Sequence, residues 1–377
     1  MSNVCCEKVS IRSLTSPSCP YRPGNTISLK TCDSGPIIKA EILTYFPATL
    51  SCCMIIRFME PAVFNNTSEC VLKLYDRRFS TDLREECEAG SWSPHLDKQY
   101  QDFVRSGDAE EFFSYWDAEK EACDDWSVAY VRNRHRWSAA KWEAYLQWVS
   151  TSMYDVEKKA YEHMIDLQGD DVPMVFGEVI LDQSMGVQDE EDLESDDFGE
   201  TKEESDAISS IDPDEYPHIV SIPGLLLQHI KGFHLTDLHH HLPYEHWQSI
   251  VDSAIKVIHR IQDCGILNRD VNTRSFIVDP ISHKTVMIDF GIVSFREDAE
   301  DDREWQMVQA QEDEEGAIGQ CMKHYLKRDT GLSIVYKPSE RSWRLGWRFR
   351  MEDGENEGGT KEEDEYVEQN REFIFEE

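Results

Sequence analysis

The sequence predicts an α+β protein with two lobes, a strand-rich lobe followed by a mainly helical one. Three observations support this fold class. Short apolar runs separated by turn residues fill residues 27–75, which is typical of an antiparallel sheet. Residues 244–263 repeat apolar side chains at helical spacing, as an amphipathic helix does. A chain of 377 residues is also long enough for two lobes, each with its own core.

The composition describes a globular protein with a strong acidic excess. Hydrophobic residues make up 40% of the chain, but 74 acidic residues stand against 38 basic ones and give a formal net charge of −36. Nucleic acids and anionic membrane surfaces attract Lys and Arg, so this excess disfavours both as partners. No run approaches the roughly 20 apolar residues of a membrane-spanning helix. We therefore expect no nucleic-acid partner and no membrane partner.

The cysteine pattern favours an intracellular protein with free thiols. The chain has 11 cysteines, an odd number, with no C-x-x-C pair and no spacing typical of a zinc site. The first ten residues lack the apolar core of a secretory leader. Disulfides are rare in the cytoplasm and nucleus, so we expect the protein to reside in one of these compartments.

Changes in composition and residue pattern along the chain predict its domain organisation. Residues 1–26 are rich in Ser, Pro and Cys and read as a flexible lead-in. Residues 27–230 form the first lobe, with an aromatic helical insertion at 97–152 and an acidic disordered loop at 188–216. A reduced helical second lobe covers 231–350, and an acidic disordered tail covers 351–377. Expected strands are 27–30, 37–43, 53–58, 70–75 and 174–181, and a separate amphipathic helix is expected at 154–167.

The residues between Gly265 and Gly291 are the most informative stretch of the chain. Two apolar runs, 276–278 and 285–288, flank a segment with turn chemistry, so they predict a β-hairpin. Asp270 stands just ahead of the first strand, and Asp289 directly follows the second. The hairpin brings both carboxylates to one end of a ribbon. Two such carboxylates could orient a hydroxyl and hold a divalent metal, as phosphoryl transfer requires. The alternative is a hairpin with two solvated Asp residues.

The same stretch resembles the protein-kinase-like superfamily, in a divergent form similar to fungal kinase-like proteins. Residues 268–270 (Asn-Arg-Asp) are similar to the catalytic-loop triplet His-Arg-Asp, and residues 289–291 (Asp-Phe-Gly) match the family motif without change. The resemblance covers about residues 27–325. Two positions depart from the pattern: Asn268 replaces His, and Ser275 replaces the metal-binding Asn.

The resemblance implies ATP and Mg²⁺ as cofactors and assigns a role to several residues. Asp270 and Arg269 would belong to the catalytic loop, and Asp289 with Ser275 would hold the metal. Lys73, inside an apolar strand, would orient the phosphates, with Glu157 behind it; Glu162 is the alternative. Kinases have a glycine-rich loop that covers the phosphates, and in the corresponding stretch of this chain Gly35 is the single glycine. The backbone of residues Gln228, His229 and Ile230 would contact adenine.

Three functions remain open at this point. The first is transfer of the ATP γ-phosphate to a hydroxyl of a protein, on Ser or Thr. The second is transfer to a small hydroxylated molecule, which the missing Ala-Pro-Glu segment favours because protein kinases use that segment as a peptide platform. The third is a weak or inactive pseudokinase that serves as an interaction scaffold, which Asn268, Ser275 and the bare phosphate loop favour.

Overall fold

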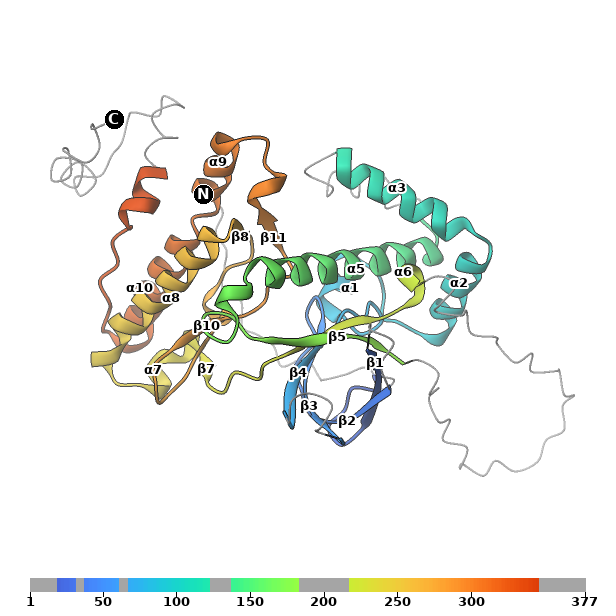
Figure 1. The fold of residues 1–377 in the computed structure, drawn as a ribbon, viewed down its shortest axis with the longest axis horizontal. Coiled ribbons are helices and arrows are strands. Elements are labelled where there is room, and N and C mark those ends of the chain that lie inside the picture. Colours follow the sequence, from blue (N-terminus) through green and yellow to red (C-terminus); the bar gives the residue numbers. More distant parts are fainter. Residues whose placement is uncertain (1–18, 32–36, 61–66, 123–136, 183–216, 346–377) are drawn as a thin grey trace, which may run out of the picture. The chain divides into compact units, whose positions relative to one another are not determined.

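The computed structural model describes residues 19–31, 37–60, 67–122, 137–182 and 217–345 (Figure 1). The expected acidic loop at 188–216 and the acidic tail at 351–377 lie outside these ranges. The chain divides into two compact units. Residues 1–155 and 175–229 belong to the first, and residues 156–174 and 230–377 to the second. Each unit is described by itself below.

The first unit is built on a six-stranded antiparallel sheet that closes into a barrel (Figure 1). The strand order is β1-β2-β3-β4-β6-β5, and β5 pairs back onto β1. The sequence analysis expected a small antiparallel sheet; the sheet is antiparallel but has no free edge strand in this part of the chain. The strands are β1 (Thr26–Thr31), β2 (Ile37–Tyr45), β3 (Cys52–Phe58), β4 (Glu69–Leu74), β5 (Val175–Leu181) and β6 (Pro223–Leu227).

Alternation of side chains along the strands fills the barrel. On β3, Cys52, Met54, Ile56 and Phe58 are all buried, with less buried residues between them. At Gly224 the strands β6 and β4 approach each other closely, because a Cβ there would lie 2.9 Å from the Lys73 carbonyl oxygen on β4. A glycine is therefore required where β6 pairs with β4.

Residues 19–25 belong to the barrel and not to a flexible lead-in. Cys19 is 4% exposed and Tyr21 2%, and both pack into the same core as the strands. The Gly24 N–H donates to the Ile42 carbonyl over 2.8 Å, which ties the segment to β2. The predicted lead-in over 1–26 is therefore wrong for these residues. The polar and Pro-rich composition of this segment gave no indication that Cys19 and Tyr21 are buried.

The described residues of the aromatic insertion predicted at 97–152 are largely helical. They lie in α2 (Pro94–Arg105), α3 (Asp108–Ala122) and α5 (Ala139–His163), and α1 (Thr81–Glu86) precedes them. Trp116, Tyr145 and Trp148 are buried in one aromatic cluster between these helices. A short helix, α6 (Pro217–Val220), precedes β6.

One helix boundary differs from the prediction. Residues 154–167 do not form a separate helix, because α5 begins at Ala139 and runs without a break to His163. No Gly or Pro interrupts residues 150–154, so nothing in the sequence ends the helix there. Ser150 is fully buried, so the segment is held in the helix by packing.

The second unit combines short strand pairs with helices. Its longest amphipathic helix, α8 (Trp247–Asp263), buries one apolar face that includes Ile250, Ala254 and Ile261. The helix α10 (Glu314–Thr330) packs on α8, begins with Asp313 as its N-cap and ends at Gly331. The other elements are η3 (Ile165–Leu167), β7 (Phe233–His234), η4 (Leu235–Asp237), α7 (Leu238–His241), η5 (Tyr244–His246), β8 (Ile266–Asn268), η6 (Thr273–Ser275), β9 (Phe276–Val278), β10 (Thr285–Met287), β11 (Val293–Phe295), η7 (Arg296–Asp298) and α9 (Asp302–Glu312).

Candidate functional site

The candidate site of the second unit is built on two short strand pairs. β9 and β10 form the predicted antiparallel hairpin, and β8 pairs with β11. Asp270 lies in the turn after β8, and Asp289 lies between β10 and β11. Both residues are exposed. The two strand pairs therefore present both carboxylates from turns that rigid elements hold at each end.

The electrostatics of Asp270 show that the two carboxylates are neighbours. Desolvation by the surrounding protein and, next, the negative charge of Asp289 raise the pKa of the Asp270 carboxyl, while Arg274 acts in the opposite direction. Water and salt screen distant charges, so an effect of this kind needs a short separation. A carboxyl with a raised pKa is a better proton acceptor than an ordinary Asp.

Asn268 connects the two turns. Its Nδ2 donates to the Asp289 carbonyl over 2.8 Å, and its Oδ1 accepts from the Asp270 N–H over 2.9 Å. The side chain is held in place because Asn268 is only 2% exposed. The sequence analysis treated this Asn as a departure from the family's His. The amide offers one donor and one acceptor in the right places, which are the two contacts that this position needs.

The residues around Asp289 adopt a strained backbone. Asp289 has φ +72°, in the left-handed region that non-glycine residues enter at a cost of about 1–2 kcal/mol. The next residue, Phe290, is fully buried and packs its ring edge-on against Tyr161 with 5.4 Å between centroids. The Phe290 anchor and the Asn268 bond together hold Asp289 in this conformation. Strain that the surroundings maintain is typical of functional positions.

Glu314 supports the backbone at Asn268 and was missed by the sequence analysis. It is 1% exposed, and it accepts from the Asn268 N–H over 2.9 Å and from Gln262 Nε2 over 2.7 Å. Burial raises the pKa of its carboxyl to about 7, against the lowering effect of these two hydrogen bonds. The residue stands in the acidic run 312–315, so nothing in the sequence distinguishes it from its solvated neighbours.

The predicted metal position, Ser275, is 6% exposed and lies at the end of η6. Its carbonyl accepts from the Ile288 N–H over 2.8 Å, which joins η6 to the end of the hairpin. Asn272 is occupied locally, because its Oδ1 accepts from the Arg274 N–H and its Nδ2 donates to the Asp270 carbonyl. Asn272 therefore shapes the turn and does not take the place of the family's metal-binding Asn.

Arg269, the third predicted catalytic residue, lies on the surface. Its Nε is 3.3 Å from Glu312 Oε1 at the end of α9, and its side chain is 52% exposed. Exposed ion pairs of this kind contribute about 0–1 kcal/mol. A catalytic role for Arg269 remains a prediction.

Lys73 is buried in the first unit. It sits on β4 opposite Cys53 and Leu225, is 6% exposed, and has its ammonium 5.7 Å from the centroid of the Tyr75 ring. A surface lysine would place its ammonium in water along an apolar stem. Lys73 is buried and therefore differs from that pattern; its role at the phosphates remains a prediction.

The remaining predicted residues lie in both units. Glu157 on α5 is fully buried and belongs to the second unit, whereas the alternative Glu162 is exposed. Residues 228–230 directly follow β6, at the boundary of the two units. Gly35 lies outside the described residues. Pairing of Lys73 with Glu157 remains a prediction, because the two residues belong to different units.

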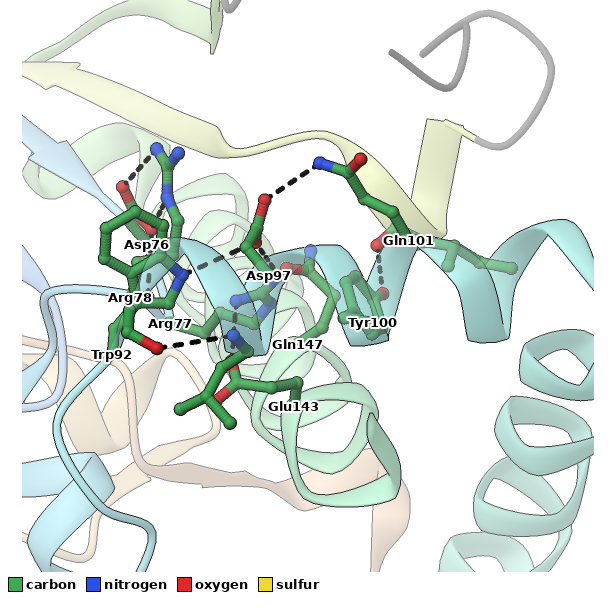
Figure 2. Close-up of polar contacts among 12 residues, drawn as sticks. Asp76, Arg77, Arg78, Trp92, Asp97, Tyr100, Gln101, Glu143 and Gln147 are labelled. Carbon is green, nitrogen blue, oxygen red and sulfur yellow. Dashed lines mark hydrogen bonds and ion pairs between the residues drawn. The ribbon is translucent and has the colours of Figure 1, made fainter. Parts of the chain in front are cut away.

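A buried network of charges in the first unit had no assigned role in the sequence (Figure 2). Arg77 donates to Glu143 over 2.7 Å and to Asp97 over 2.8 Å, and Arg84 donates to the same Glu143 over 2.6 Å. Arg77, Arg84 and Glu143 are each at most 5% exposed. These bonds join the residues after β4 to α1, α2 and α5.

A second part of this network surrounds Asp76. Arg78 contacts both carboxylate oxygens of Asp76, at 2.9 and 2.8 Å, and the Tyr21 hydroxyl donates to it as well. Desolvation raises the pKa of Asp76, but Arg78 outweighs it and holds the pKa below its ordinary value. The carboxylates of Asp76, Asp97 and Glu143 balance the guanidinium groups of Arg77, Arg78 and Arg84, which is the arrangement that buried charges require.

Two further features concern helices that could span a membrane and side chains that could bind a metal ion. Among the described residues, no helix combines the length and the apolar content that crossing a bilayer takes. Within the same residues, His, Cys, Asp and Glu side chains form no group of three or more that could hold a metal ion.

Comparisons with known proteins give matches among solved structures alone. No family model and no curated protein sequence matches the chain. Among solved structures, the chain is similar to the crystal structure of a mutant of the Mycobacterium tuberculosis PknI kinase domain. The two are 12% identical, and the match covers 81% of this chain and 85% of that chain with a TM-score of 0.32. A TM-score this low does not establish a shared fold.

Proposed function

We propose that this protein is an ATP-dependent phosphotransferase of the protein-kinase-like type that transfers the γ-phosphate to a hydroxyl acceptor, on Ser or Thr of a protein. The observation that carries the proposal is the pair of neighbouring carboxylates, Asp270 and Asp289, whose turns Asn268 connects. Phosphoryl transfer depends on positioning and electrostatic stabilisation, so two fixed carboxylates are the groups it needs. The resemblance of residues 268–270 and 289–291 to kinase motifs supports the same assignment.

Each carboxylate has a separate role in this proposal. Asp270 orients the acceptor hydroxyl and takes up its proton, for which its raised pKa is suitable. Asp289 faces solvent from a strained turn and holds the metal. Lys73 orients the phosphates, as the resemblance implies.

The residues present fit magnesium. Mg²⁺ prefers oxygen ligands and usually takes one or two carboxylates together with substrate phosphates and waters. Asp289 offers an exposed carboxylate, and Ser275 offers a hydroxyl as a weaker second ligand. The mutual repulsion of Asp270 and Asp289 also favours a cation beside them. When bound, the ion neutralises charge on the phosphates.

A thermal-shift series tests this proposal. ATP with Mg²⁺ should raise the Tm of the parent protein, and Asp289→Asn should abolish most of that shift. Asp252→Asn is the matched control, because it removes the same charge from an exposed position on α8. Transfer of radiolabel from ATP to protein substrates should then fall by about 10³-fold or more in Asp270→Asn, while the nucleotide-induced shift remains. No shift in the parent protein would refute nucleotide binding.

A small hydroxylated acceptor is the second candidate. After Gly291 the chain forms only β11 and η7 before α9 begins at Asp302. This short connection leaves little backbone for a peptide platform, which favours a small molecule. Labelling a panel of small alcohols beside the protein substrates separates the two acceptor classes. If nucleotide binds and neither class is labelled, the pseudokinase alternative, which Ser275 favours, replaces both.

A further inference from the structure

A cavity of about 500 Å³ lies in the second unit, and none of its lining residues belongs to the candidate site described above. Five lining residues come from α8, two from the turn before β5, and two from the start of β10. Small-molecule sites typically measure roughly 300–1,000 Å³. The cavity is therefore large enough for a ligand that is bigger than a single ion.

Three cationic side chains line this cavity. Lys256 and Arg260 stand one turn apart on α8 and therefore share a face of the helix, and Lys284 directly precedes β10. In a chain with 38 basic and 74 acidic residues, such a cluster does not follow from composition. Within the described part of the chain, no acidic side chain pairs with the Lys256 ammonium. The cavity thus offers a cation to an external anion.

Asp170 forms weak ion pairs with the other two cations, Lys284 and Arg260. Its carboxylate lies 2.5 Å from Lys284 Nζ and 3.2 Å from an Arg260 nitrogen. All three side chains are 41–57% exposed, and exposed ion pairs contribute about 0–1 kcal/mol. An anion that also contacted Lys256 would compete well for both partners. Asp170 therefore behaves as an internal substitute for a ligand.

Asp171 keeps the cavity in shape when Asp170 moves away. Its side chain is 2% exposed and forms an ion pair with Arg260. Its backbone carbonyl accepts from the Met287 N–H on β10 over 2.8 Å, so the turn is fixed to the hairpin. Arg260 consequently remains in position whether or not Asp170 contacts it.

A pair of hydroxyl groups adds a hydrogen-bond donor. Ser253 Oγ and Thr285 Oγ1 lie 2.8 Å apart in the cavity wall. Only one of the two hydroxyls can donate to the other, so the pair keeps a second O–H for a ligand oxygen.

We propose that this cavity binds a phosphomonoester group. Such a group carries a charge of about −1.5 to −2 at pH 7 and three terminal oxygens that accept hydrogen bonds. These match the two ammonium charges of Lys256 and Lys284, the N–H groups of Arg260 that Asp170 contacts, and a hydroxyl donor. A carboxylate has one charge and two oxygens and would leave a cation unused. The group belongs to a phosphorylated side chain of a peptide or to a free phosphorylated metabolite, and the chemistry of recognition is the same.

Titration calorimetry on the full chain at constant ionic strength tests the site. The probes are inorganic phosphate, a phosphoserine peptide, free phosphoserine, and acetate as the carboxylate. Lys256→Gln should weaken phosphate binding roughly tenfold, since it removes one charge-assisted contact. Asp170→Asn should tighten binding several-fold, since it removes the internal competitor. Lys323→Gln, an exposed lysine on α10 outside the cavity, is the charge-matched control and should leave binding within twofold.

The test is decisive because Lys256→Gln should weaken phosphate binding and Asp170→Asn should strengthen it. Binding that Lys256→Gln and Lys323→Gln change equally would overturn the proposal, because it would reflect general charge or another site. An Asp170→Asn variant that binds no better than the parent protein would overturn it as well. Acetate should bind at least tenfold more weakly than phosphate; equal binding would refute the phosphomonoester assignment. The peptide and free phosphoserine support the site equally, and the tighter of the two identifies the source.

Discussion

Removal of the Glu143 carboxylate should destabilise the first unit more than any surface change. Glu143 is 1% exposed and neutralises two buried guanidinium groups, that of Arg77, which Figure 2 labels beside it, and that of Arg84. Glu143→Gln keeps the size of the side chain but leaves three buried cations against two carboxylates. Breaking a buried ion pair from one side costs about 3–5 kcal/mol. A unit of this size loses about 2–4 °C in Tm per kcal/mol, so we expect a fall of about 6–20 °C.

Thermal and urea unfolding followed by tryptophan fluorescence measure this loss, since Trp116 and Trp148 are buried in the same unit. Glu85→Gln is the matched control, because Glu85 is exposed on the neighbouring α1. The control should change the free energy of unfolding by no more than about 0.5 kcal/mol. Adding Arg84→Gln to Glu143→Gln should restore part of the stability, because it returns the network to charge balance.

The reasoning fails if Glu143→Gln and Glu85→Gln are equally stable, since the carboxylate would then be solvated or replaceable. It fails as well if the double variant is less stable by the full sum of the two single changes. Additive losses would mean that Arg84 and Glu143 act independently, which their 2.6 Å contact does not allow.

Three further predictions concern other positions. Glu314→Gln should make the free energy of unfolding less dependent on pH. In the folded protein the pKa of the Glu314 carboxyl is raised from 4.5 to about 7. The free energy of unfolding of the parent protein should therefore fall by up to about 3 kcal/mol as pH rises from about 4.5 to about 7. Urea unfolding at pH 5 and pH 8 measures this, and equal slopes in both proteins would contradict it. Gly224→Ala places a Cβ 2.7 Å from a leucine methyl and 2.9 Å from a carbonyl oxygen of β4, so thermal unfolding should show a loss of about 1–3 kcal/mol; an unchanged Tm would contradict that contact. Asn268→Ala should lower phosphate transfer about 10²-fold in a radiolabel assay, because both catalytic turns lose their link, and full activity would show that the link is dispensable.

The strands of the barrel could be predicted from sequence, but the closure of the barrel could not. The apolar side chains of β3 predict a strand, and the alternating burial along it agrees with that prediction. Closure depends on pairing between Lys30 on β1 and Ile180 on β5, which lie 150 residues apart in the chain. Periodicity contains no information about the partner of an edge strand. The lead-in was misjudged for a related reason, because Tyr21 is buried by residues distant in the chain: its ring packs against Tyr45 and Phe79, and its hydroxyl donates to Asp76.

The candidate site shows the same division between local and long-range information. Two turns around a hairpin place Asp270 and Asp289 close to each other, and spacing alone predicts that. The contacts that hold those turns come from elsewhere: Glu314 reaches Asn268 across 46 positions of the chain. A single glutamate in an acidic run carries no signal of burial. The sequence therefore predicts the two candidate carboxylates and misses a residue that holds their turns in place.

The replacement of His by Asn at position 268 has a consequence for pH dependence. An imidazole that linked the two turns would gain a proton near pH 6.5 and lose its acceptor, whereas the Asn amide keeps one donor and one acceptor at every pH. The link between Asp270 and Asp289 is therefore insensitive to pH by itself. Burial raises the pKa of Glu314 to about 7, and Glu314 accepts from the backbone N–H of the same Asn268. A change in the geometry of the two turns that originates at Glu314 between pH 6 and pH 8 should disappear in Glu314→Gln while the Asn268 bonds persist.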